Sequence, residues 1–254
     1  MSDLEVQRRP GQTWMTITRE AKRNALNDEV LRGMLAVLTH PGDARVVLVD
    51  SVGRVFCSGA DLVQMAPGSS GLAVHEARGL LREVVLAMQA CPVPVVGVVQ
   101  GPCLAGGVGL VLGCDLVLAA QDAEFGLPEV DLGLWPFMVS ALLARHVSPK
   151  QAMELMLTGR RVPAAEALAL GLVSRVVESA ALREEAESLA ATLAAKPPAA
   201  VRLGKAAFQA ALDAPLPAAL AALQAQLSLL AMSDDAAEGV AAFLDKRPPR
   251  WTGH

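Results

Sequence analysis

The stretch Val84–Cys114, VVLAMQACPVPVVGVVQGPCLAGGVGLVLGC, decides the fold, because its 31 residues carry no charge and it ends among closely spaced glycines. A membrane helix needs about 20 apolar residues without a break, and prolines and glycines interrupt this run repeatedly between residues 92 and 102. The valine-rich part from Pro94 to Gln100 predicts a strand buried on both faces, and Leu104 to Gly113 predicts a compact apolar helix. We therefore expect a buried strand followed by a core helix, and no membrane span.

Outward from this run, strands alternate with helices, which is typical of an α/β fold with a largely parallel sheet. Further strands are expected at Thr13–Thr18, Arg45–Asp50, Asp115–Ala119 and Leu172–Val177. Helices are expected at Asn27–Leu38, Leu72–Ala90, Pro149–Leu157, Pro163–Leu170, Ala180–Ala195, Val201–Leu212, Leu216–Met232 and Asp234–Leu244, with a flexible polar loop at Pro67–Gly71. From Ser148 onward the pattern becomes helical, so we predict an α/β core over residues 1–190 and a C-terminal helical portion over residues 191–254.

The composition excludes several classes of function. The chain has 254 residues, 53% of them hydrophobic and 19% charged, and its formal net charge of -4 argues against a nucleic-acid partner. Its four cysteines form no Cys-x-x-Cys pair and its four histidines are scattered, so neither a metal site nor a disulfide framework is expected. The first residues lack the apolar region of a signal peptide. Together these features predict a cytoplasmic protein.

Two glycine-containing loops follow adjacent predicted strands, Cys57-Ser-Gly-Ala-Asp-Leu62 and Leu104-Ala-Gly-Gly-Val-Gly109. Each is expected to open a helix, where backbone N–H groups are unpaired and a small residue lets a ligand approach the backbone. Two such loops side by side are able to aim one N–H each at a single oxygen, as in an oxyanion hole. Tight strand–helix turns without a ligand are the alternative interpretation.

Glu129 lies between Pro128 and Val130, with Trp135 close behind. A carboxylate in such apolar surroundings is costly unless it has a partner or a task. Desolvation raises the pKa of a carboxyl towards the range useful for proton transfer. A surface acid in a turn is the alternative. Trp135 lines an acyl pocket or belongs to the core.

The order of these segments resembles the enoyl-CoA hydratase/isomerase, or crotonase, family. The matching segments are Asn24-Ala-Leu26, Phe56–Asp61, Gly101 with Ala105-Gly-Gly107, Cys114-Asp115, Phe125-Gly126, Pro128-Glu129, Leu132-Gly133, Leu157–Arg160, Ala164 to Val173 and Phe243–Arg250. The resemblance covers nearly the whole chain. It implies a crotonase-like spiral of β-β-α units, an acyl-CoA thioester substrate, no cofactor other than the coenzyme A of that substrate, and a homotrimer or a hexamer built as a dimer of trimers.

The resemblance also assigns roles to positions of this sequence. The N–H groups of Ala60 and Gly106 would form the oxyanion hole, and Glu129 would be the acid/base. The residues implied in substrate or CoA binding are Lys22, Arg23, Ala25, Leu26, Ser58, Gly59, Asp61, Leu62, Gly107, Gly109, Trp135, Phe243 and Lys246, the last two from the same or a neighbouring subunit.

One position departs from the family pattern. Hydratases of the family carry a first glutamate at the position that here is Gly109. Hydration needs one group to deprotonate water and another to supply a proton, whereas a 1,3 double-bond shift needs a single base. Glu129 alone therefore favours an isomerase or an atypical hydratase, and Gly109 is expected to leave room for water or a bulkier acyl group. An acyl-CoA-binding or scaffolding homologue without full catalysis, and an enzyme that decarboxylates or hydrolyses acyl-CoA, remain open.

Neighbouring groups offer weaker substitutes. Asp131, Asp61 and Glu124 are acidic, but none is placed convincingly to replace the missing glutamate. Cys57 and Cys103 adjoin the expected donors, yet a catalytic thiol needs a nearby base. We expect both cysteines to be buried packing residues.

Overall fold

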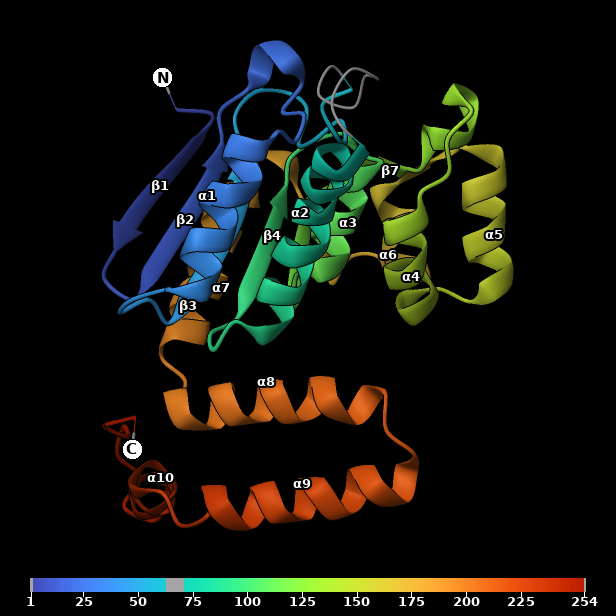
Figure 1. Cartoon of the computed structure of the whole chain (residues 1–254). Helices are drawn as coiled ribbons and strands as arrows, with labels where there is room; N and C mark the ends of the chain where they lie inside the picture. The colour runs from blue at the N-terminus through green and yellow to red at the C-terminus, as the bar shows by residue number, and fades with distance from the viewer. Residues whose placement is uncertain (1, 63–70, 254) are drawn as a thin grey trace.

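The computed structural model describes residues 2–62 and 71–253, which form an α/β core with a layer of helices below it (Figure 1). The main sheet of this described part has the strand order β1-β2-β3-β4-β6-β9, in which only β1 and β2 pair antiparallel. Its strands are β1 (Leu4–Arg9), β2 (Gln12–Ile17), β3 (Val46–Ser51), β4 (Val95–Val99), β6 (Leu116–Ala120) and β9 (Arg175–Val177). A smaller sheet joins β5 (Cys103–Leu104), β7 (Glu124–Gly126) and β8 (Arg161–Pro163). The expected α/β fold with largely parallel pairing is confirmed.

Both faces of the main sheet are covered by helices, as a parallel sheet requires. Val47 and Val49 of β3 pack into a large core with α1 (Asp28–Thr39), α2 (Gly71–Ala90) and α3 (Gly106–Gly113). Val46 and Leu48 point to the opposite face, where they pack against α7 (Leu182–Ala194). This alternation explains why the strand reads as a continuous apolar run.

The uncharged run is buried where the sequence predicts it. Every residue of β4 and every residue of α3 is buried. Among the described residues, no single helix is long and apolar enough to cross a membrane. The consecutive helices Leu216–Leu230 and Asp234–Leu244 pass that test only when they are taken together across a bend of 72°.

The C-terminal helices α8 (Pro198–Leu212), α9 (Leu216–Leu230) and α10 (Asp234–Leu244) lie below the core, and α8 runs along its lower edge (Figure 1). Lys205 of α8 fastens this layer, because its Nζ lies 2.6 Å from a carboxylate oxygen of Asp115 and donates to the carbonyl oxygens of Met88 and Val93. The expected division at residue 190 falls inside α7 and stays a prediction.

The mainly helical part of the chain begins before Ser148, which corrects the expectation. The helix α4 (Phe137–His146) precedes α5 (Pro149–Thr158) and α6 (Ala164–Leu170). Residues 67–70 of the predicted polar loop lie outside the described residues, and Gly71 already begins α2.

Candidate active site

The two glycine loops lie in direct contact. Cys57 and Cys103 form a parallel bridge, and the N–H of Leu104 donates to the carbonyl oxygen of Cys57 at 2.8 Å. Further along, Gly59 has φ +102°, and a Cβ there would lie 2.6 Å from the Cβ of Ala105. A side chain at position 59 is therefore excluded both by the backbone conformation and by the second loop.

The backbone of the first loop turns the N–H of Ala60 away from its neighbouring segment. Leu26 donates its N–H to the carbonyl oxygen of Gly59 at 2.8 Å and accepts from the N–H of Asp61 at 2.9 Å. Because hydrogen bonds alternate along an extended chain, the N–H of Ala60 points to the other edge. On that side a Cβ built on Gly106 would lie 3.6 Å from the nitrogen of Ala60.

The N–H of Gly106 is also unpaired, because Gly106 is the first residue of α3 and the first N–H groups of a helix have no partner within it. Within residues 2–62 and 71–253, neither Ala60 nor Gly106 donates its N–H to a backbone or side-chain acceptor. Two unpaired donors thus adjoin each other in space, although they are 46 positions apart in the sequence.

Ala105, the residue before Gly106, has φ 51° and ψ -124°, a conformation that residues with a side chain rarely adopt. Its N–H donates to the carbonyl oxygen of Gly126 at 2.9 Å, which holds the strained residue against β7. Such strain costs about 1–3 kcal/mol and is typical of functional sites.

Glu129 lies in the 3₁₀ helix η2 (Pro128–Leu132), directly after β7. Because β7 pairs with β5, and β5 leads into α3, this segment adjoins the loop that carries Gly106. Its carboxylate is half-buried, and in the described structure the buried oxygen Oε2 has no hydrogen-bond partner. Burial raises the pKa of this carboxyl above its ordinary value.

Gly109 does not face the open space that the sequence led us to expect. A Cβ at this position would lie 3.3 Å from Cγ2 of Val139 in α4 and 3.8 Å from Cδ2 of Leu81 in α2. Leu81 also covers Gly106, where a Cβ would lie 3.4 Å from the same methyl group. An apolar wall therefore stands where the side chain of a residue at 109 would begin.

Comparison with known proteins decides the family. The model of the enoyl-CoA hydratase/isomerase family matches residues 9–254. The chain belongs to this family. It is 34% identical to the 2,3-dehydroadipyl-CoA hydratase of Escherichia coli over 257 residues, which cover 100% of both chains. A crystal structure of an enoyl-CoA hydratase from Mycobacterium smegmatis superposes with a TM-score of 0.94 at 34% identity, covering 98% of each chain. Human enoyl-CoA hydratase domain-containing protein 3 gives a TM-score of 0.94 at 32% identity, covering 98% of this chain and 100% of the human one. The crotonase fold expected from the resemblance is thereby confirmed.

The two segments that the family resemblance assigns to CoA run side by side. Ser58 donates its N–H to the carbonyl oxygen of Arg23 at 3.0 Å. Ala25 and Leu26 are buried, whereas Lys22, Arg23 and Leu62 are exposed. Gly107 has a packing role in this family member, because a Cβ there would lie 2.8 Å from the Cβ of Cys57.

Other assigned residues lie elsewhere. Trp135 is half-buried and packs against the main core. Phe243 is 83% exposed at the end of α10, and Lys246 follows it, so both lie far from α2 and α3 within one chain (Figure 1). Their expected role in a neighbouring subunit stays a prediction.

Burial removes the thiol alternative, because it raises the pKa of Cys57 to about 12 and that of Cys103 well above its ordinary value. A thiol held protonated is a poor nucleophile. Within the described ranges, no group of three or more His, Cys, Asp or Glu side chains is placed to hold a metal ion. Sequence reasoning missed Val139 and Leu81, because an apolar residue in a helix carries no signal of what it covers.

Proposed function

We propose that this family member converts a 3-enoyl-CoA thioester into the 2-enoyl-CoA thioester by moving its double bond one position towards the thioester. The thioester oxygen would accept hydrogen bonds from the N–H groups of Ala60 and Gly106, and Glu129 would move the proton. Preorganised backbone donors stabilise the negative charge that develops on such an oxygen.

The steps balance with one carboxylate. The Glu129 carboxylate takes a proton from C2 of a 3-enoyl thioester, and the electron pair of that C–H bond spreads over a dienolate whose oxygen the two N–H groups hold. The protonated Glu129 then returns the proton at C4, which leaves a conjugated 2-enoyl thioester. No water is consumed, so no second acid/base group is required.

The contrast between Glu129 and Gly109 carries the choice of isomerisation. The unpaired Oε2 of Glu129 supplies a base, while Val139 and Leu81 leave an apolar wall at Gly109, where the family's hydratases carry their other glutamate. A water molecule needs two to four polar partners to be held in place. Support for an isomerase therefore comes from the wall as much as from the base.

The test is a panel in which the purified protein meets 3-enoyl- and 2-enoyl-CoA thioesters of several chain lengths and the products are separated. We expect a shifted alkene from wild type and at least a 100-fold loss of turnover in Glu129→Gln, the lower range for removing a positioned acid/base. A hydroxyacyl product at a comparable rate would contradict isomerisation. Unchanged turnover in Glu129→Gln would contradict the assigned proton carrier.

A second candidate is a homologue that binds acyl-CoA without turning it over. The glycine at 109 favours it, since one acidic side chain is missing. The unpaired Oε2 opposes it, because a buried carboxylate oxygen without a partner destabilises a protein that has no use for it. Calorimetry with a saturated acyl-CoA, combined with no product across the panel, would support this candidate.

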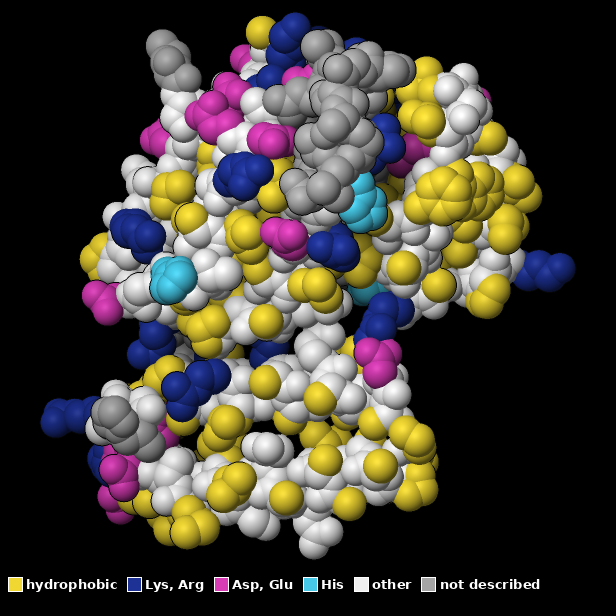
Figure 2. All heavy atoms as spheres, viewed as in Figure 1, with side chains coloured by type: hydrophobic (Ala, Val, Ile, Leu, Met, Phe, Trp, Pro, Cys, Tyr) yellow, Lys and Arg dark blue, Asp and Glu magenta, His cyan; other side chains and the backbone are white. Residues whose placement is uncertain are grey.

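We also propose self-association into a trimer or a dimer of trimers. Leu216 is 70% exposed on α9, and hydrophobic side chains spread along the visible face of the C-terminal helices (Figure 2). Exposed apolar patches of this extent are typical of interaction surfaces. Light scattering on the eluted protein tests the mass. We place this reaction in the cytoplasm and propose no cofactor beyond the coenzyme A of the substrate.

A further inference from the structure

We infer that Arg19 is a positioning residue that holds Ala60 in place as an oxyanion donor. This inference rests on the proposed function, because it gives a task to a charged network beside the donor loop. Arg19 precedes η1 (Glu20–Lys22), in a connection that the sequence did not single out.

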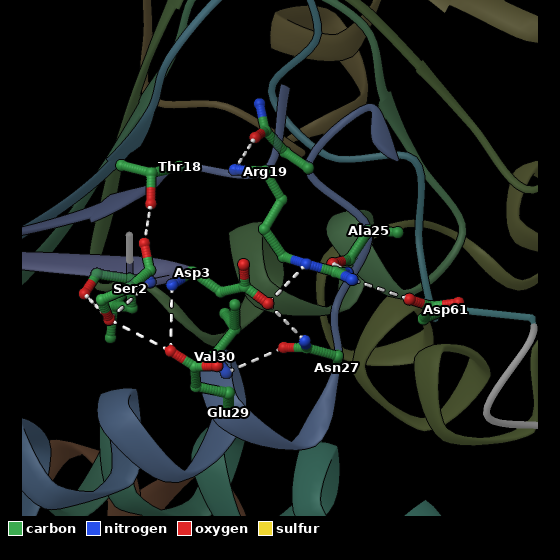
Figure 3. A network of polar contacts seen from close by, with 11 residues as sticks. Ser2, Asp3, Thr18, Arg19, Ala25, Asn27, Glu29, Val30 and Asp61 are labelled. Carbon is green, nitrogen blue, oxygen red and sulfur yellow. Dashed lines mark hydrogen bonds and ion pairs between the residues drawn. The ribbon is translucent and has the colours of Figure 1, made fainter. Parts of the chain in front are cut away.

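The guanidinium of Arg19 makes three contacts in three directions (Figure 3). Nη2 lies 2.9 Å from a carboxylate oxygen of Asp61, and Nε lies 2.9 Å from a carboxylate oxygen of Asp3. Nη1 donates to the carbonyl oxygen of Ala25. The side chains of Arg19 and Asp61 are only 10% and 12% exposed, so solvent screens their ion pair less than it would a surface pair.

Two of these contacts bracket the donor. Asp61 follows Ala60 directly, and Ala25 precedes Leu26, whose N–H and carbonyl groups hold Gly59 and Asp61. One guanidinium thus fastens both the loop that carries Ala60 and the segment to which that loop is hydrogen-bonded. Ala60 itself has a methyl side chain and no polar group with which to fix its own orientation.

The third contact ties the network to a helix. The carboxylate of Asp3 accepts from Nδ2 of Asn27 at 2.6 Å, and Oδ1 of Asn27 accepts from the N–H of Val30 at 3.0 Å, which caps α1. Through Asp3 and Asn27, the position of Arg19 is therefore fixed relative to the helix α1. A lysine at 19 would keep the charge but lacks the planar fork needed for all three contacts.

The expected consequence is a loss of rate rather than of affinity. A misplacement of about 1 Å costs up to 10²-fold in rate, and removal of one oxyanion donor costs about 10²–10³-fold. The loss of rate from a displaced donor should be smaller than the loss from complete removal of a donor. We expect Arg19→Gln and Arg19→Lys to lower kcat about 10- to 100-fold with KM changed less than about threefold.

The decisive readout is the absorption of a conjugated dienoyl-CoA bound to protein carrying Glu129→Gln, which slows turnover at least 100-fold. Hydrogen bonds to the thioester oxygen polarise the conjugated system and move its absorption to longer wavelength. We expect a clear shift with Glu129→Gln alone and a reduced shift at saturation when Arg19→Gln is added. Asp61→Ala should also reduce it, and adding Asp61→Ala to Arg19→Gln should reduce it no further, because Arg19→Gln already breaks the contact between the two residues.

Arg183→Gln is the matched control. It also removes an arginine–aspartate pair, with Nη1 of Arg183 3.0 Å from a carboxylate oxygen of Asp50, but this arginine is exposed and lies on the α7 side of the sheet. We expect the control to keep wild-type kcat and the full spectral shift. If Arg19→Gln does not fold, Asp61→Ala carries the test.

The outcomes separate two kinds of failure. No shift with Glu129→Gln alone means that Ala60 and Gly106 do not hold the thioester oxygen, which overturns the proposed function. A full shift that persists in Arg19→Gln and Asp61→Ala, with kcat equal to that of the control, leaves the oxyanion hole intact and overturns the positioning role.

Discussion

Placing a glutamate at position 109 tests whether an apolar wall, rather than the missing side chain alone, keeps this protein from hydration. The first methylene of Gly109→Glu would lie 3.3 Å from Cγ2 of Val139 and 3.8 Å from Cδ2 of Leu81, so Val139 must give way by a few tenths of an ångström. Overpacking of this kind costs about 1–3 kcal/mol. Replacing glycine by a better helix former inside α3 offsets only about 0.5 kcal/mol. We therefore expect Gly109→Glu to lower the free energy of unfolding and to yield little hydroxyacyl product.

Adding Val139→Ala opens the wall. That change alone removes two methyl groups and should cost about 1.6 kcal/mol, at about 0.8 kcal/mol for each buried carbon. In Gly109→Glu/Val139→Ala the new side chain fills this space, so the double variant should be no less stable than Val139→Ala. Because a positioned acid/base contributes about 10²–10⁴-fold, hydration should rise at least 100-fold over Val139→Ala.

The assay combines urea unfolding of the wild type and the three variants with separation of products from a 2-enoyl-CoA. Gly109→Ala is a further control, since its methyl tests the 3.3 Å contact without a charge. If Gly109→Glu alone hydrates as fast as the double variant and is as stable as wild type, the wall is not the obstacle and this reasoning is refuted.

Four further outcomes follow from the site. Because burial raises the pKa of Glu129, and the base must be ionised, the acid limb of kcat/KM should lie above the ordinary carboxyl value of 4.5; a limb at or below it would contradict the burial. The raised pKa also means that the stability Glu129 contributes at low pH is lost as pH rises through its folded pKa, so Glu129→Gln should raise Tm at pH 8 relative to wild type, but not at pH 4, in scanning calorimetry. Gly59→Ala should destabilise by more than about 1 kcal/mol and lower kcat, because φ is +102° and the new Cβ would lie 2.6 Å from that of Ala105; a neutral result in unfolding and rate measurements would exclude this strain. Cys57→Ala should keep kcat within about threefold, since a thiol with a pKa of about 12 is no nucleophile, and a loss above 100-fold would revive the thiol mechanism.

The elements that could be predicted are those whose signal is local. The strand β4 and the helix α3 follow from apolar runs broken by glycine and proline, and α1 begins after Asn27 as expected, with the N–H of Val30 donating to its side chain. The edge strand β1 was missed, since only Leu4 of its residues is buried and the rest read as polar surface. The strands β5, β7 and β8 are too short for any periodicity to register.

The features of the site also divide into those with a local signal in the sequence and those without one. The meeting of Ala60 with Gly106 was expected, because loops that follow neighbouring parallel strands end at one edge of a sheet. The closure at Gly109 was not, because it depends on how α2 and α4 pack across α3, which no local pattern encodes. The predicted room at this position was wrong for that reason.

Three features coincide at this edge of the sheet. Ala105 holds a strained backbone, Ala60 and Gly106 leave their N–H groups unpaired among the described residues, and Glu129 buries a carboxylate oxygen without a partner. The strain at Ala105 and the unsatisfied oxygen of Glu129 each cost on the order of 1–3 kcal/mol, a large share of the net stability of a domain. A protein that kept only the fold would be stabilised by relaxing either of them. Their coincidence beside an apolar wall fits a site prepared for a ligand that brings an oxygen to the donors and an acidic C–H to the base, and that excludes water from the reaction.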